Sequence, residues 1–283
     1  MGQILDGKAF ANLKADKLKE KVKKLKADGI QPLFCVINIG DDSASKIYVR
    51  TKKRRAKKIG IEQKIYQLPA NEQESDVIKL IDQLNVDPKV NGIMVQLPVP
   101  DQIDENHLLS RIDPEKDVDG LTPASAGRLW QGTHFVEPAT AAGIIGLLEH
   151  YQIDLDGKNM VIIGRSNIVG KPLAALALEK NATVSLLHRH TQSLKEYTQK
   201  ADIIVSAAGQ ANLITADMIK PGAVVIDVGI NHVNGHLVGD VAFDEVKDKA
   251  SWITPVPGGV GPLTVEYLME QVVKLTRRAN GRQ

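Results

Sequence analysis

The fold of this 283-residue chain is decided by one short segment, Gly164–Gly170, with the sequence GRSNIVG. It follows the apolar run 160–163 and leads into 171–178, which has the composition of a helix. A strand, a glycine turn and a helix in this order can bind a pyrophosphate, because the first helical turn presents unpaired backbone N–H groups. The pattern departs from G-x-G-x-x-G, since Ser166 replaces the second glycine and the last glycine comes one residue late. The turn therefore indicates an α/β domain, and its ligand needs further support.

That support lies one strand downstream, where the apolar run 182–187 ends in His188-Arg189-His190-Thr191. Sites that prefer NAD usually place Asp or Glu here, as an acceptor for the ribose 2′-hydroxyl. A guanidinium at Arg189 instead suits a 2′-phosphate, which an acidic side chain would repel. The alternative is a solvent-exposed arginine on a loop. With the glycine turn at the expected distance upstream, we predict that the cofactor is NADP.

Composition excludes several classes of protein. The hydrophobic fraction of 43% and the charged fraction of 25% are those of an ordinary soluble domain, and the net charge of +2 gives no reason to expect nucleic acid as a partner. No apolar run approaches the ~20 residues of a membrane span, so no membrane association is expected. The single cysteine, Cys35, is predicted to be a core residue of a strand. The first residues lack a signal-peptide core, and we expect a cytoplasmic protein.

Short apolar runs alternate with helical patterns along the chain. Strands are predicted at 33–39, 61–67, 92–97, 160–163, 182–187, 202–206 and 223–228. Helices are predicted at 8–28, 44–59, 71–85, 170–180, 193–200 and 262–279. Asn71 with Glu74 is the predicted cap of the helix at 71–85. The alternation predicts an α/β fold with right-handed crossovers and mainly parallel sheets.

The polar segment 113–120 is predicted to mark a domain boundary. This gives one α/β domain at 1–120 plus 262–283 and a Rossmann-type nucleotide-binding domain at 121–261. Glycine and polar residues cluster just past the predicted strand ends, where ligands bind in open α/β sheets. We therefore expect a cleft between the two domains.

The segment 46–58 holds eight basic side chains, most of which project away from an apolar stripe formed by Ser45, Tyr48, Val49, Ala56 and Ile59. Lys52 falls near the centre of that stripe. Burial would lower its pKa toward the range that is useful for proton transfer. The alternative for Lys52 is a side chain that extends past the stripe to solvent. The alternative for the whole segment is a basic patch that binds nucleic acid, but the segment lacks the interleaved aromatic residues of such patches.

Five segments now occur in a recognisable order. They are YVRTK (48–52), VQLPVP (95–100), DVDG (117–120), GRS (164–166) and PGGVGPLT (257–264). In order and spacing they closely resemble the bifunctional methylenetetrahydrofolate dehydrogenase/methenyltetrahydrofolate cyclohydrolase (FolD) family, over nearly the whole chain. Leu263 stands where that family usually has Met, and 137–141 (EPATA) departs from the usual Pro-Cys-Thr-Pro. Neither change removes a group that proton or hydride transfer requires.

The resemblance implies oxidation of 5,10-methylenetetrahydrofolate with NADP, followed by hydrolysis of the methenyl product to 10-formyltetrahydrofolate. These are reactions of one-carbon metabolism, and the resemblance also implies that the protein is a homodimer. Lys52 would be the general acid/base, Gln96 would hydrogen-bond near it, Tyr48 would stack on the aminobenzoyl ring, and Asp119 would bind the pterin. The remaining substrate contacts that it implies are Val95, Leu97, Pro257, Gly258, Gly259, Val260 and Gly261. Those to the cofactor are Gly164, Arg165, Ser166, Arg189 and Ile230. No metal ion is expected.

Two other functions remain open at this point. One is a different NADP-dependent dehydrogenase on a similar two-domain plan, which would need neither Lys52 nor Gln96. The other is a non-catalytic nucleotide-binding protein, in which the set Tyr48, Lys52, Gln96 and Asp119 would have no purpose.

Overall fold

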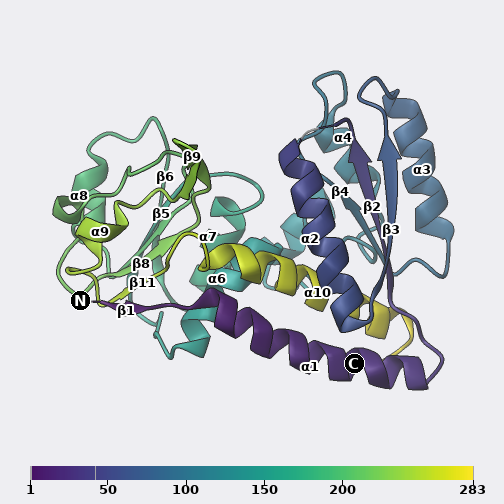
Figure 1. Cartoon of the computed structure of the whole chain (residues 1–283), viewed down its shortest axis with the longest axis horizontal. Helices are drawn as coiled ribbons and strands as arrows, with labels where there is room; N and C mark the ends of the chain where they lie inside the picture. Colours follow the sequence, from purple (N-terminus) through teal and green to yellow (C-terminus); the bar gives the residue numbers. More distant parts are fainter. Residues whose placement is uncertain (1, 42, 283) are drawn as a thin grey trace. The chain divides into compact units, whose positions relative to one another are not determined.

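The computed structural model (Figure 1) describes residues 2–41 and 43–282, and for residues 43–48 it describes the backbone alone. The chain divides into two compact units, unit 1 with Met1–Asn12 and Thr140–Thr264, and unit 2 with Leu13–Ala139 and Val265–Gln283. The domains predicted from the sequence, 1–120 with 262–283 and 121–261, have other bounds and stay a prediction.

Unit 2 is built on a three-stranded parallel sheet of the order β3-β2-β4. Its strands are β2 (Leu33–Ile39), β3 (Glu62–Leu68) and β4 (Gly92–Val95), and they are connected by α2 (Ser43–Ile59) and α3 (Glu74–Val86). The chain crosses from β2 to β3 in one direction and from β3 to β4 in the other. Right-handed crossovers therefore place α2 and α3 on opposite faces of this sheet.

Successive side chains of β4 point alternately to these two faces. Ile93 and Val95 are buried in a cluster with Val77 and Ile81 of α3. Met94, between them, points to the face that α2 covers. Cys35 of β2 is buried in the α3-side cluster, which confirms its predicted core position, and burial raises the pKa of its thiol to about 11.

The other helices of unit 2 are α4 (Glu105–Arg111), α5 (Pro123–Trp130) and most of α1 (Gly7–Ala27) and α10 (Val260–Ala279). The cap predicted at Asn71 is wrong, because α3 begins at Glu74 after Gln73, whose side chain makes no capping bond. The Glu74 carboxylate instead accepts a bond from the Asp104 backbone N–H at 2.7 Å and contacts His107 Nδ1 at 2.7 Å. A partner 30 residues away thus outweighs the local signal.

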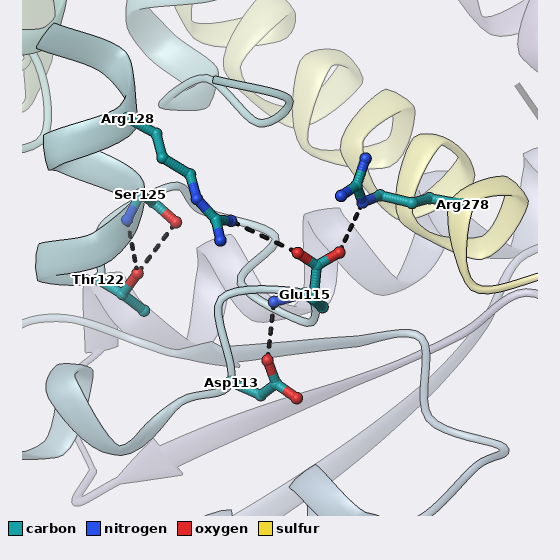
Figure 2. A network of polar contacts seen from close by, with 6 residues as sticks. All are labelled: Asp113, Glu115, Thr122, Ser125, Arg128 and Arg278. Atoms are coloured by element: carbon teal, nitrogen blue, oxygen red, sulfur yellow. Dashed lines mark hydrogen bonds and ion pairs between the residues drawn. The ribbon is translucent and has the colours of Figure 1, made fainter. Parts of the chain in front are cut away.

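The loop between α4 and α5 is attached to both α5 and α10 through Glu115 (Figure 2). Its carboxylate pairs with Arg278 Nε of α10 at 2.6 Å and with Arg128 of α5 at 3.5 Å. Asp113 accepts the Glu115 backbone N–H at 2.9 Å, and Thr122 caps α5 by accepting the Ser125 N–H at 3.1 Å. These contacts attach the first part of the loop that carries Asp119 to the two helices.

Unit 1 is built on a six-stranded parallel sheet of the order β1-β11-β8-β7-β5-β6. The strands are β1 (Gln3–Ile4), β5 (Asn159–Ile163), β6 (Thr183–Leu187), β7 (Ile203–Ser206), β8 (Val224–Asp227) and β11 (Trp252–Ile253). The helices are α6 (Ala139–His150), α7 (Gly170–Glu179), α8 (Leu194–Thr198), the 3-10 helix η1 (Ala216–Met218) and α9 (Phe243–Val246), and a hairpin is formed by β9 (Asn231–Val233) and β10 (His236–Val238).

The chain passes from β5 to β6 on one side and then returns to β7 on the other side of β5. The strand order thus reverses at β5, which is where nucleotides bind in such sheets. The predicted α/β class, with parallel sheets and a Rossmann-type second half, is confirmed. Among the described residues, no helix is long and apolar enough to cross a membrane.

Candidate active site

Lys52 is buried on α2, on the face that packs against the sheet of unit 2. Its side chain is 9% exposed, and Val49, Ala56 and Ile59 around it are also buried, as the apolar stripe predicts. The ammonium donates to Gln96 Oε1 at 3.0 Å and contacts Met94 Sδ at 3.4 Å. The alternative in which Lys52 extends to solvent is therefore wrong. Burial lowers the pKa of Lys52, while the charge of Asp119 opposes this shift.

Gln96 links Lys52 to the end of β4. It lies two residues after Met94, so both side chains point to the α2 face, and its Nε2 donates to the Leu97 carbonyl at 2.8 Å. Its Oε1 is thereby turned toward Lys52. Val95 and Leu97 belong to the opposite face, where their side chains pack in the α3-side cluster. A contact of Val95 with substrate would have to come from the backbone, because its side chain is buried, whereas Leu97 is only partly buried.

Asp119 lies in a loop that a second carboxylate shapes. Asp117 is 1% exposed and accepts the backbone N–H groups of Gly120 at 2.9 Å, Leu121 at 3.3 Å and Thr122 at 2.8 Å. Asp119 itself is partly buried. Burial raises its pKa to about 6, with the charge of Lys52 lowering it and that of Asp117 raising it further. Lys52, Gln96 and Asp119 thus form one electrostatically coupled set within unit 2.

Two further residues have a place beside this set, one predicted from the sequence and one seen in the structure. The side chain of Tyr48 lies outside the described residues, so its stacking role stays a prediction. Met94 contacts the Lys52 ammonium and was not singled out from the sequence. The signal was available, because Met94 precedes Gln96 by two positions in a strand and must share its face.

The glycine turn of unit 1 follows β5 at the carboxyl edge of the six-stranded sheet. Gly164 has φ +117°, and a Cβ there would lie 2.2 Å from the Ala207 carbonyl oxygen, so only glycine fits. Arg165 and Ser166 are exposed, and Ser166 Oγ accepts the Val169 N–H at 3.2 Å. α7 begins at Gly170, which confirms the predicted order of strand, turn and helix.

Arg189 is exposed two residues after β6, and its Nε contacts His190 Nε2 at 3.2 Å. The turn is held by the His188 N–H, which donates to Thr191 Oγ1 at 2.9 Å. Ile230 follows β8 and is 47% exposed. These residues follow strands of the same parallel sheet, at the edge that carries the glycine turn, and their chemistry suits a phosphorylated nucleotide.

The segment Pro257–Gly261 also belongs to unit 1 and leads into α10. The Gly258 carbonyl accepts the Lys8 N–H at 2.9 Å, and the Gly259 N–H donates to the Pro255 carbonyl at 2.8 Å. Val260 is buried, so its backbone rather than its side chain is available to a ligand. The predicted cleft between the two domains stays a prediction.

Comparisons with known proteins agree with this geometry. The family "Tetrahydrofolate dehydrogenase/cyclohydrolase, catalytic domain" matches residues 5–119, and its "NAD(P)-binding domain" matches residues 138–280. The bifunctional protein FolD of Lactobacillus helveticus is 70% identical over 282 residues, which is 100% of both chains.

Solved structures of such enzymes have the same fold. The bifunctional dehydrogenase/cyclohydrolase FolD of Campylobacter jejuni has a TM-score of 0.97 at 46% identity and covers 98% of this chain and 99% of its own. The FolD of Trypanosoma brucei, in complex with NADP and an inhibitor, has a TM-score of 0.94 at 37% identity and covers 99% and 98%.

These matches confirm the predicted methylenetetrahydrofolate dehydrogenase and methenyltetrahydrofolate cyclohydrolase of one-carbon metabolism, and they leave both alternative functions without support. The chain belongs to the tetrahydrofolate dehydrogenase/cyclohydrolase family, with a catalytic domain and an NAD(P)-binding domain.

Proposed function

We propose that the chain oxidises 5,10-methylenetetrahydrofolate with NADP held by residues of unit 1, and uses Lys52 of unit 2 to hydrolyse the methenyl product to 10-formyltetrahydrofolate. The observation that supports this most directly is the 3.0 Å bond from the buried Lys52 ammonium to Gln96. An amine in this setting gives up its proton more readily than an exposed lysine does, because burial disfavours its charged form and lowers its pKa.

The oxidation needs positioning more than proton transfer. NADP supplies the hydride acceptor. Gly164, Arg165 and Ser166 would hold its pyrophosphate at the start of α7, Arg189 its 2′-phosphate, and Ile230 would contact it beyond β8. The backbone of Pro257–Gly261 would contact the folate.

The hydrolysis needs a proton carrier. Water adds to the methenyl carbon, and the neutral Lys52 amine takes the proton that the water loses. The same ammonium then returns a proton to the ring nitrogen N5 as the bond between N5 and the carbon breaks. The added hydroxyl group releases its remaining proton to solvent in this step and becomes the carbonyl oxygen, which leaves the formyl group on N10. Gln96 Oε1 holds the Lys52 nitrogen in place during both transfers. Asp119 would accept bonds from the pterin amino group, and Tyr48 would stack on the aminobenzoyl ring.

An absorbance assay tests the proposal as a whole. With methylenetetrahydrofolate and NADP, we expect reduced cofactor to accumulate and the methenyl absorbance to rise and then decay. Methenyltetrahydrofolate supplied alone should be hydrolysed without any cofactor. Absence of turnover in both assays would refute the proposal.

The substitution Asp119→Asn should lower both activities together. It keeps the size of the side chain but presents an amide donor where the pterin needs an acceptor. In the unsubstituted enzyme, the pKa of about 6 means that the acceptor form of Asp119 is present above that pH and is lost below it. The KM for folate should therefore rise as the pH falls through about 6, and this dependence should disappear in Asp119→Asn.

The control is Asp113→Asn, in the same loop, where the carboxylate accepts the Glu115 N–H at 2.9 Å. We expect its kinetic constants to stay near those of the unsubstituted enzyme. A loss of the cyclohydrolase with an intact dehydrogenase in Asp119→Asn would contradict the role in pterin binding.

We further propose a cytoplasmic homodimer. The family resemblance supports the dimer, and the single buried cysteine suits a reducing compartment. Sedimentation of the purified chain would report its oligomeric state.

A further inference from the structure

Two buried aspartates of unit 1 take no part in the roles assigned so far. Asp227 is the last residue of β8, and Asp240 follows β10. Their exposed fractions are 3% and 0%. A buried carboxylate is retained at a high desolvation cost unless donors surround it, so the partners of these two groups indicate what they hold.

The Asp240 carboxylate accepts five hydrogen bonds. Its Oδ2 accepts bonds from Ser206 Oγ at 3.1 Å and from the backbone N–H groups of Ala208 at 2.7 Å and Gly209 at 3.2 Å. Its Oδ1 accepts bonds from the Gln210 N–H at 2.9 Å and from Asn231 Nδ2 at 3.0 Å. Three of the donors are consecutive backbone amides of the loop that follows β7. The fourth and fifth come from the end of β7 and from the residue after Ile230. One side chain therefore determines the course of two loops.

Asp227 holds the backbone of Asp240 in turn. Its Oδ1 accepts the N–H groups of Asp240 and Gly229, each at 2.9 Å, and its Oδ2 accepts that of Val241 at 2.9 Å. The fit leaves no room for side chains. A Cβ on Gly229 would lie 2.2 Å from Asp240 Oδ1, and one on Gly239 would lie 1.8 Å from Asp227 Oδ2.

The loop that Asp240 holds lies beside the glycine turn. The Ala207 N–H donates to the Ile163 carbonyl at 2.7 Å, and the Ala207 carbonyl occupies the place where a Cβ of Gly164 would point. The loop after β7 thus lines the point at which the strand order reverses. Its amides at 208–210 are engaged by Asp240 and not by the neighbouring strands.

We propose that Asp240 is a positioning residue for the nicotinamide nucleotide, because it holds the loop Ala207–Gln210 and the segment Ile230–Asn231 in the arrangement that receives the cofactor. The inference rests on the proposed function of unit 1. A loop that is already ordered binds its ligand without a further loss of conformational entropy. Weakening the bonds to Asp240 should therefore weaken the binding of both NADP and NAD.

Asp240→Asn tests this role. An amide turns at least one N–H group toward donors that need an acceptor, and the loop amides lose charge-assisted bonds. We expect the KM for NADP to rise about tenfold or more, with a similar factor for NAD. Hydrolysis of added methenyltetrahydrofolate should stay near the unsubstituted rate, because Lys52, Gln96 and Asp119 belong to unit 2. Amide hydrogen exchange at 208–210 should accelerate.

Two further variants separate positioning from general loosening. Ser206→Ala removes one neutral donor and should fold, with the KM for both cofactors raised about two- to tenfold. Asp202→Asn makes the same exchange at the amino end of β7, where the carboxylate accepts the Asn159 N–H at 2.8 Å and pairs with Lys220. It should lower the melting temperature and leave both KM values unchanged.

The outcomes are distinguishable. Unchanged cofactor KM values in Ser206→Ala and in folded Asp240→Asn, with both activities present, would refute the positioning role and leave the proposed function intact. An equal rise of KM in Asp202→Asn would refute it as well, because the effect would then be general. If the unsubstituted enzyme had no dehydrogenase activity, the proposed function itself would fail.

Discussion

Lys52→Met should abolish most of the cyclohydrolase activity and spare the dehydrogenase. Removal of a general acid/base lowers a rate by at least ~10²-fold, whereas hydride transfer needs no protonic catalyst. Met keeps most of the length and the apolar stem, so the packing through Val49, Ala56 and Ile59 should survive. Its thioether would end next to Met94 Sδ, which already contacts the lysine nitrogen. Both rates should be measured on the same folded variant.

The matched control is Lys53→Met, one residue further along α2, where the lysine is exposed. It removes the same charge from the same helix and should leave both activities near those of the unsubstituted enzyme. Circular dichroism would check that each variant is folded. Hydrolysis at a near-normal rate in Lys52→Met would mean that the proton carrier is another group.

Arg189→Ala should weaken the binding of NADP and leave the binding of NAD nearly unchanged. A charge-assisted bond to the 2′-phosphate contributes on the order of 1.5–3 kcal/mol, so its loss should raise the Kd for NADP roughly ten- to a hundredfold. NAD carries no phosphate at this position. Because Arg189 is exposed and its Nε contacts the neighbouring His190, little stability should be lost. Titration calorimetry with each cofactor would measure both constants.

A second exposed cation of unit 1 provides the comparison. Lys195 of α8 pairs through its Nζ with Asp217 Oδ2 of η1 at 2.6 Å. Lys195→Ala removes the same charge, and we expect it to change neither Kd. Equal losses of NADP and NAD affinity in Arg189→Ala would mean that this arginine does not bind the 2′-phosphate.

The parts of the fold that could be predicted from the sequence are those that local pattern specifies. β2 was predicted at its observed bounds, 33–39, because its apolar run is long and is flanked by turn residues. β1 and β11 have two residues each and carry no periodicity, so they exist only through pairing with their neighbours in the sheet. The same reason explains the wrong cap at Asn71, where contacts from α4 decide what Glu74 does.

The residues of the site can likewise be divided into those that local sequence predicts and those that only the folded structure brings together. Lys52 was predictable because a charge in an apolar stripe is visible in one helix, and Gln96 because it ends a strand. Asp240 was not predictable, because four of its five donors lie 30 to 34 positions upstream and only the folded sheet brings them together. Asp117 is an intermediate case, since its donors lie three to five positions ahead but no apolar pattern marks them.

The alternation along β4 makes its length inflexible. Ile93 and Val95 face the cluster under α3, while Met94 and Gln96 face the buried amine. An insertion or deletion of one residue would exchange the two sets, which would put an amide into the hydrocarbon interior and a methyl group against the ammonium. Substitutions at Ile93 and Val95, by contrast, should alter chiefly the melting temperature, and those at Met94 and Gln96 chiefly the turnover. This strand should therefore tolerate exchanges of single residues better than any change in its length.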